Sequence, residues 1–141
     1  MRRGLSLTEL LLVVVLIGLL GLIAVPRIAA LHDGARLRTE SFRLVAAVDY
    51  ARGTAVRLGT TSRLTLSDLS YIVAAAPADT LTEVWRAPGP ASNSVRISGA
   101  GAPILFGSSG IAVGASNRTL LLTRGGVSRR IILSRLGRIT W

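Results

Sequence analysis

The stretch GLSLTELLLVVVLIGLLGLIAVP, from Gly4 to Pro26, decides the fold of this chain. From Leu10 to Val25 it has 16 consecutive residues without a charge, and almost all of them are strongly apolar. With the preceding residues Leu5 to Glu9, the run reaches the length of about 20 residues that a helix needs to cross a bilayer core. We therefore predict a transmembrane helix over residues 5–26.

The residues before this run form a short basic leader, Met1-Arg2-Arg3-Gly4. By the positive-inside rule, the two arginines keep the N-terminus in the cytoplasm and place the chain after Pro26 on the other side of the membrane. A cleaved secretory signal is the alternative, but Ala24-Val25-Pro26-Arg27 matches a small-x-small cleavage site poorly. We expect a single-pass anchor.

Glu9 is the one charged residue of the quoted segment. An acidic side chain at the centre of a bilayer costs about 2.5 to 3.5 kcal/mol on insertion scales, so it is expected to have a partner or a function. A glutamate that reaches the membrane interface and has no role is the alternative interpretation.

Composition limits the classes of protein that remain. The chain has 141 residues, half of them hydrophobic, which suffices for one small domain and an anchor. All 17 basic residues are arginines, and the formal net charge of +10 favours contact with anionic surfaces. With no cysteine and one histidine, His32, disulfides and multi-histidine metal sites are excluded. Because no acid/base pair or activated nucleophile is recognisable, we expect no enzymatic activity and no cofactor, and we assign no residue as a metal ligand.

A second helical pattern follows the membrane segment. Its apolar and small residues recur at spacings of three and four: Leu37, Ser41, Leu44, Val48, Ala51, Ala55 and Leu58. Residues 27–59 are therefore predicted to form an amphipathic stem helix that ends at Gly59. Pro26 is where the long helix is expected to bend. The stripe spans only about three heptads. It is therefore more typical of a helix that packs against a globular domain than of a coiled coil with a partner helix.

After Gly59 the pattern changes to short segments of period two, separated by Gly, Pro, Asn and Asp. Six segments are predicted strands: SRLTLS, SYIVAA, TEVWRA, NSVRIS, RTLLLTR and SRRIILSR. Gly125-Gly126 is the predicted hairpin turn between the last two. The predicted fold class is α+β: a long N-terminal α-helix, transmembrane plus amphipathic stem, packed on a C-terminal antiparallel β-sheet domain over residues 60–141.

The N-terminal residues resemble the type IV prepilin signature: a basic leader, Gly4, the segment Leu5-Ser6-Leu7-Thr8-Glu9 and an apolar helix with Pro26 at its far end. In that family a membrane peptidase cuts on the cytoplasmic side after the glycine and methylates the new N-terminal amine. The resemblance implies that residues 1–4 are a leader peptide, that prepilin peptidase cleaves between Gly4 and Leu5, and that Leu5 is methylated. It also implies an inner-membrane protein with its C-terminal domain in the periplasm and a pilin-like architecture.

The resemblance also implies a role for Glu9 in filament assembly. Four residues advance a helix by about 6 Å, so Glu9 lies one turn from the amine that cleavage creates on Leu5. A methylated amine keeps its positive charge. In filaments of this family, the resemblance implies, the carboxylate meets the amine of a neighbouring subunit. Pairing within one chain remains open, because groups at i and i+4 share a helix face.

Features over most of the chain resemble the H-type minor pseudopilin and FimT family: LVAAVDYARGTAVRLGTTSRLTL, ILFGSSGIA and the ending SRRIILSRLGRITW. This resemblance implies a minor pseudopilin, a structural subunit of a type II secretion pseudopilus that helps export folded proteins across the outer membrane. Its partners would be other pseudopilins. The alternative is a FimT-like minor type IV pilin involved in pilus assembly or DNA uptake.

Arginines near the C-terminus are candidate DNA-binding residues under that alternative. Between Val84 and Trp141 the chain has eight arginines and no acid, an electrostatic pattern that nucleic acids select. The candidates are Arg124, Arg129, Arg130, Arg135 and Arg138. Gly137-Arg138-Ile139-Thr140 resembles the Gly-Arg-x-Arg element through which FimT-type minor pilins are thought to hold DNA, with Thr140 in place of the second arginine. The other interpretation is that these arginines lie on a solvent-exposed face of the sheet and do not bind DNA.

Two further features of the sequence are candidate binding sites. The segment GSSG, Gly107 to Gly110, is predicted to be a loop and not a phosphate site, because no helix is predicted after it. Loop carboxylates such as Asp68, Asp79 and Glu83 leave binding of a metal ion open.

Overall fold

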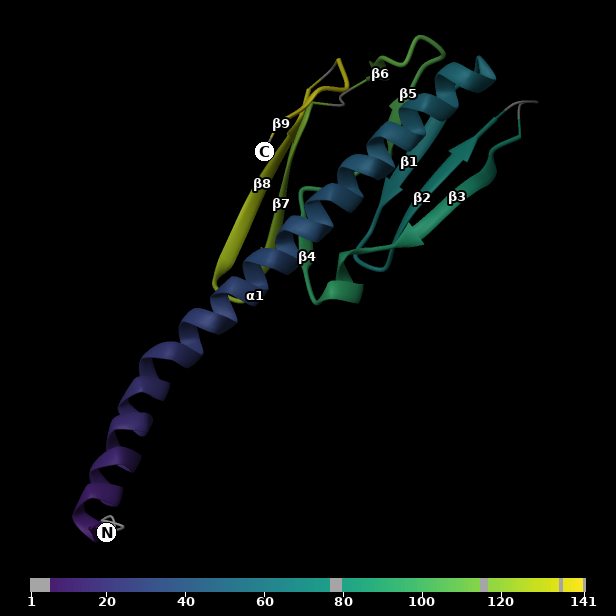
Figure 1. Ribbon diagram of the computed structural model, residues 1–141. Coiled ribbons are helices and arrows are strands. Elements are labelled where there is room, and N and C mark those ends of the chain that lie inside the picture. The colour runs from purple at the N-terminus through teal and green to yellow at the C-terminus, as the bar shows by residue number, and fades with distance from the viewer. Residues whose placement is uncertain (1–5, 77–79, 115–116, 135, 141) are drawn as a thin grey trace.

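One long helix carries a β domain on its C-terminal half (Figure 1). The computed structural model describes residues 6–76, 80–114, 117–134 and 136–140. Four candidate residues named above lie outside this range: Gly4, Leu5, Asp79 and Arg135.

The long helix, α1 (Leu7–Leu58), begins and ends at capping residues. Ser6 is the N-cap, and its hydroxyl accepts a hydrogen bond from the backbone N–H of Glu9 at 3.2 Å. At the other end Gly59 takes the left-handed conformation, with φ of 63°, and its N–H donates to the carbonyls of Ala55 and Val56. Glycine adopts this conformation without the steric cost of a Cβ, and the predicted end of the helix at Gly59 is confirmed.

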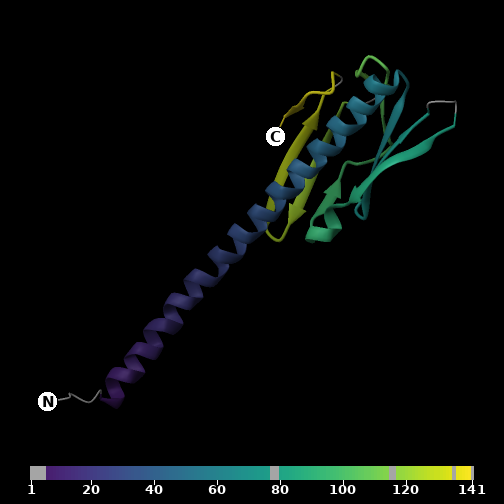
Figure 2. The same cartoon turned by 45° about the vertical axis from the view of Figure 1, so that its right-hand side comes forward.

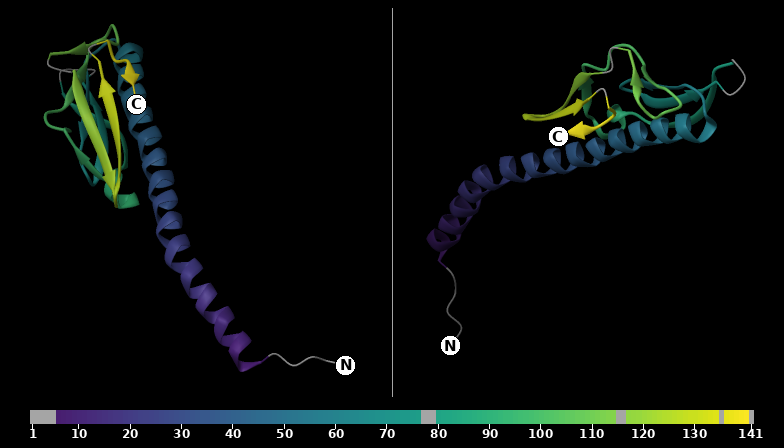
Figure 3. Two further views of the ribbon diagram at one scale, coloured as in Figure 1. Left: turned by 90° about the vertical axis from the view of Figure 1, so that its left-hand side faces the viewer. Right: turned by 90° about the horizontal axis from the view of Figure 1, so that it is seen from above.

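The 52 residues of α1 form one continuous helix of about 78 Å. It runs through Pro26 without a break, and its N-terminal half curves away from the line of its C-terminal half (Figure 3). The most apolar 18-residue window has a mean hydropathy of 2.7, and none of it is buried. By length and composition, α1 is the one helix of the described residues that could cross a membrane.

Two antiparallel sheets pack on the C-terminal half of α1 (Figure 2). The first sheet has the order β3-β2-β1-β5-β6 and the second the order β4-β7-β8-β9. A short 3-10 helix, η1 (Pro90–Asn93), precedes β4. The strands are β1 (Ser62–Leu66), β2 (Ser70–Ala75), β3 (Thr82–Pro88), β4 (Arg96–Ser98), β5 (Ile104–Phe106), β6 (Ala112–Val113), β7 (Arg118–Arg124), β8 (Val127–Leu133) and β9 (Ile139–Thr140).

The fold agrees with the predicted class, and the six predicted segments form β1, β2, β3, β4, β7 and β8. Gly125, with φ of 54°, and Gly126 make the predicted turn, and Arg124 pairs with Val127 across it. Strands β5, β6 and β9 are additional, and each has only two or three residues, too few for a period of two to be visible. The GSSG segment is the turn between β5 and β6, where the Gly110 N–H donates to the Gly107 carbonyl at 2.8 Å; its interpretation as a loop is confirmed.

The core lies between the stem stripe and both sheets. Six of the seven predicted stripe residues are buried, and they contact a core that includes Leu64 and Tyr71 of the first sheet and Leu120 and Ile131 of the second. Burial of this apolar area supplies the main force that holds α1 to the sheets. Leu58 was assigned to the stripe wrongly: it is 44% exposed at the last helical residue, beyond the sheet contacts. Stem arginines off the stripe, including Arg38, Arg43 and Arg52, are exposed as predicted.

Candidate assembly site and polar junction

Glu9 lies in the first turn of α1, at the N-terminal end of the exposed apolar half of this helix. Ser6 at the N-cap and Glu9 three residues later have the spacing of a capping box. The Glu9 side chain is exposed, and no described residue forms a hydrogen bond or ion pair with its carboxylate. Its position in the first turn favours a negative charge by about 0.3 to 1 kcal/mol through the helix dipole. The carboxylate is thus available to a cation from outside the described residues.

Apolar side chains cover every side of the helix between Leu7 and Leu31. Leu7, Leu22 and Leu31 are 78%, 75% and 74% exposed, and this half of α1 has no buried residue. A helix that is apolar all round is stable only when lipid or other protein covers it. This half therefore needs a bilayer, neighbouring helices or both.

A buried carboxylate, Glu40, lies where the stem enters the domain. It is fully buried, and its Oε1 accepts from the Tyr71 hydroxyl at 2.9 Å. Its Oε2 accepts from the Asn93 side-chain amide at 2.8 Å, with the Arg43 guanidinium 3.6 Å away. Burial, and then the neighbouring Glu40 charge, raise the pKa of Tyr71 well above its usual value, so this phenol remains a donor. Sequence reasoning missed Glu40, although its position three residues after Leu37 places it on the predicted stripe.

Asn93 connects Glu40 to a second ion pair. Its side-chain oxygen accepts from Arg36 at 3.0 Å, and its backbone carbonyl accepts from Arg124. Arg124 also pairs with Asp33 of α1, with 2.7 Å between Nε and Oδ1. We call the set Asp33, Arg36, Glu40, Tyr71, Asn93 and Arg124 the polar junction. It joins α1 to η1 and to both sheets, so it fixes the direction in which the stem leaves the domain.

The β7–β8 turn lies so close to α1 that a side chain at Gly125 would have to displace the Asp33 carboxylate. A Cβ at Gly125 would lie 2.3 Å from Oδ2 of Asp33, and φ there is already positive. We expect Gly125→Ala to lower the free energy of unfolding by about 1 to 3 kcal/mol, because the clash and the backbone strain add. Thermal unfolding of the full chain in detergent measures this.

Gly126→Ala is the matched control for that substitution, because nothing lies within 4 Å of a Cβ at Gly126. Its melting temperature should stay close to that of the wild type. Equal melting temperatures for Gly125→Ala and Gly126→Ala would show that a Cβ at position 125 costs no stability through contact with Asp33 or through backbone strain.

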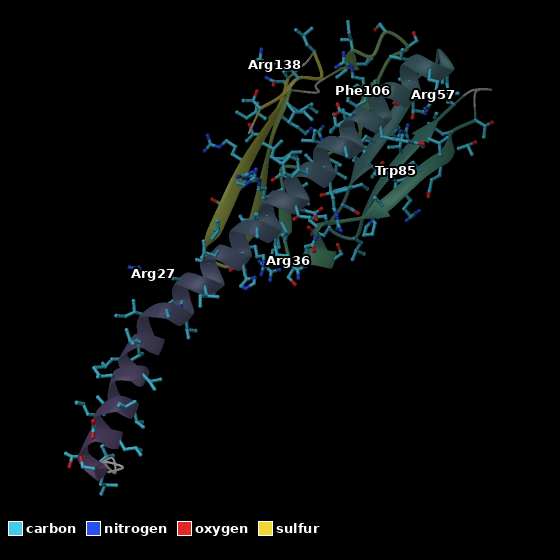
Figure 4. The ribbon with its side chains drawn as sticks, viewed as in Figure 1. Arg27, Arg36, Arg57, Trp85, Phe106 and Arg138 are labelled. Atoms are coloured by element: carbon cyan, nitrogen blue, oxygen red, sulfur yellow. The ribbon has the colours of Figure 1, made fainter. Side chains whose placement is uncertain are left out.

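The candidate DNA-binding arginines do not share one surface. Side chains alternate along β8, so Arg129 lies on the helix-facing side with buried Ile131, and Arg130 lies on the outer side. Arg124 is engaged in the polar junction. Arg138 is exposed and lies beyond the far end of β8 from the Gly125-Gly126 turn (Figure 4). The structure brings Arg124 and Arg129 together and separates them from Arg130 and Arg138.

The loop carboxylates within the described residues have protein partners. Asp68 accepts from the Ile97 N–H at 3.1 Å. Glu83 accepts two hydrogen bonds from Arg86, at 2.7 and 2.8 Å, and these bonds lower the pKa of Glu83. The described residues contain no group of three or more His, Cys, Asp or Glu that could hold a metal ion.

Comparison with known proteins agrees with this architecture. The sequence profile of the family described as "Type II transport protein GspH" matches residues 41–137, the second half of the stem and nearly all of the β domain. The chain is 35% identical over 104 residues to the type II secretion system protein H of Xanthomonas campestris pv. campestris. That match covers 70% of this chain and 54% of the relative, so the chain spans about half the length of the curated relative that it matches.

Solved structures share the fold at low sequence identity. The chain is similar to the type IV minor pilin FimU of Pseudomonas aeruginosa in two crystal forms, with TM-scores of 0.65 and 0.61 at 18% identity. The alignments cover 77% and 74% of this chain and 89% and 90% of the FimU chains. At this identity the likeness establishes the pilin fold, whereas the profile match, which covers more than half of the chain, establishes the family. The chain belongs to the GspH family of type II transport proteins.

Proposed function

We propose that this chain is a minor pseudopilin, a non-enzymatic structural subunit of the periplasmic filament of a type II secretion system. One observation carries the proposal. A single continuous helix joins an exposed apolar half, which ends at Glu9, a carboxylate without a partner among the described residues, to a half that carries a GspH-type domain. The apolar half suits storage in a bilayer and later packing among the helices of a filament. The β domain then forms the outer surface of that filament.

The proposal includes the layout of the chain along the membrane. Residues 1–4 are the leader peptide, residues 5–26 cross the inner membrane, residues 27–59 form the stem, and residues 60–141 form the periplasmic domain. The basic leader and the uncharged run support this orientation.

Processing at the leader gives a direct test. The membrane peptidase should remove Met1 to Gly4, because the cut requires a small residue on that side. Intact-mass analysis of the protein from membranes should find a chain that begins at a methylated Leu5. Gly4→Phe should accumulate as an uncut precursor, and a mature chain that begins anywhere except Leu5 would contradict the assignment.

In the assembled state we propose that Glu9 pairs with the N-terminal amine of a neighbouring subunit. The carboxylate is unpaired within the described residues and lies at the end of an apolar surface, where a pair of opposite charges is weakly screened. The pair would set the axial register between subunits. Apolar contacts are non-directional and specify this register weakly, whereas an ion pair fixes the position of one helix relative to the next.

DNA binding is the property that would favour the alternative role in DNA uptake. Because the described arginines divide between two faces, we expect weak, nonspecific attachment to duplex DNA that physiological salt abolishes. Titration of the full chain in detergent at low and physiological salt, repeated with Arg130→Ala and Arg138→Ala, measures this. Tight binding that survives physiological salt and is lost in both variants would favour DNA uptake over secretion.

A further inference from the structure

A polar cavity opens between the end of η1 and the β7–β8 turn. It has a volume of about 230 Å³ and is lined by Ser94, Arg96, Thr123, Arg124 and Gly125. Arg96 and Thr123 are direct cross-strand partners of β4 and β7, so their side chains lie next to each other on the outer face of the second sheet. Arg124 closes the cavity on the side toward α1.

The lining of this cavity offers two guanidinium groups, which only donate, and two hydroxyls, which can also donate. Within the described residues, the Arg96 guanidinium and the hydroxyls of Ser94 and Thr123 form no hydrogen bond or ion pair. Among the described residues, Asp33 is the one carboxylate that forms an ion pair with a lining residue, Arg124, and it balances one of the two guanidinium charges. The cavity therefore keeps a net positive charge and donors that are matched to an oxyanion.

The cavity lies at the end of the domain nearest the apolar half of α1. The β7–β8 turn and η1 form this end in both views of the molecule (Figures 1 and 2). The turn contacts α1 at Asp33, which is seven residues after Pro26, or about 10 Å along the helix. The headgroup layer outside the hydrocarbon core is about 5 to 8 Å thick. In a membrane-anchored chain the cavity would adjoin the phosphates of the outer leaflet.

We propose that this cavity binds the phosphate of an anionic phospholipid headgroup while the subunit is stored in the membrane. This inference rests on the proposed membrane anchoring. A volume equivalent to several water molecules accepts a phosphodiester group together with part of its headgroup. Arg27 and Arg36 of α1 lie toward this end of the domain and add to its positive charge (Figure 4). Binding would hold the domain down on the membrane surface, and entry into a filament would release it.

Native mass spectrometry of the full chain in an uncharged detergent tests the proposal. The probes are phosphatidylglycerol and phosphatidylcholine with identical acyl chains, so that the apolar half of α1 binds both equally. Both lipids have a phosphodiester, but the positively charged cavity would repel the choline cation, so only the anionic lipid satisfies it. The wild type should retain phosphatidylglycerol preferentially, and Arg96→Gln should reduce that preference about tenfold, the value of one charge-assisted hydrogen bond. Arg96 is exposed and without a described partner, so this variant keeps the fold.

Arg63→Gln is the matched control, because Arg63 is an exposed arginine on β1 of the other sheet. It should keep the wild-type preference. An equal loss in Arg63→Gln, or no loss in Arg96→Gln, would overturn the proposal. So would binding of inorganic phosphate that depends on Arg96 without a preference for phosphatidylglycerol, which would make the cavity a small-anion site. Carbonate extraction of the same variants tests anchoring separately, so a failed anchor and a failed cavity give different results.

Discussion

Glu9→Ala is expected to leave the subunit processed and folded but almost absent from filaments. Without the carboxylate, the N-terminal amine of the neighbouring subunit would remain charged and unpaired among apolar helices. Leaving one charge of a buried pair uncompensated costs about 3 to 5 kcal/mol, which corresponds to at least a hundredfold loss of incorporation. Pull-down of a tagged neighbouring pseudopilin, with quantification of this chain, measures the effect.

Two control variants separate pairing from capping of the helix. Ser6→Ala removes the hydroxyl that caps α1 and costs about 0.5 to 2 kcal/mol of helix stability, but it keeps the Glu9 charge. Glu83→Ala removes an exposed carboxylate of β3. Both should be incorporated nearly as well as the wild type. Wild-type incorporation of Glu9→Ala would show that the pairing proposal is wrong, and a loss in Ser6→Ala equal to that in Glu9→Ala would assign the effect to capping.

Glu40→Ala should be the most destabilising substitution in the domain. It leaves the Tyr71 hydroxyl and the Asn93 amide buried without their acceptor and opens a cavity beside α1. Each buried donor left without an acceptor costs about 1 to 3 kcal/mol, so we expect the free energy of unfolding to fall by about 2 to 6 kcal/mol. Urea unfolding of the full chain in detergent, followed by the fluorescence of Trp85 in a Trp141→Phe background, reports on the core, because Trp85 stacks on Tyr50 of α1 at 5.1 Å.

Asp49→Ala is the matched control, since Asp49 is an exposed carboxylate on the same helix. Its effect should stay within about 0.5 kcal/mol. Tyr71→Phe removes one of the two donors and should have an intermediate effect of about 1 to 2 kcal/mol, because Glu40 keeps Asn93 and Arg43. If Glu40→Ala unfolds at the same urea concentration as Asp49→Ala, the polar junction does not hold the stem to the domain.

The elements that local patterns predict well are the long ones. Spacings of three and four residues identify the buried stripe from Leu37 to Ala55, since a helix repeats every 3.6 residues. Gly59 marks the helix end because the left-handed conformation there suits glycine. Strands β1, β2, β7 and β8 have five to seven residues each, and their buried residues alternate as expected for a sheet with one buried face. Hydropathy alone identifies the half of α1 that cannot remain in water.

Contacts between distant segments could not be predicted from such patterns. Asp33 and Arg124 are 91 positions apart, and nothing local in either segment indicates the other. The burial of Glu40 could not be predicted either, because it depends on two donors, the Tyr71 hydroxyl and the Asn93 amide, that lie far away in the sequence. The division of the strands into two sheets depends on these contacts too, and so does the separation of Arg129 from Arg130.

Deletion of the gene for this chain tests the central claim most directly. Type II secretion should fail, so that folded exported proteins accumulate in the periplasm and disappear from the medium, while DNA uptake and type IV pili remain. A plasmid copy of the wild type should restore secretion, and a copy with Glu9→Ala should not. Normal secretion in the deletion strain, together with loss of DNA uptake or of pili, would contradict the assignment of this chain to the secretion pseudopilus.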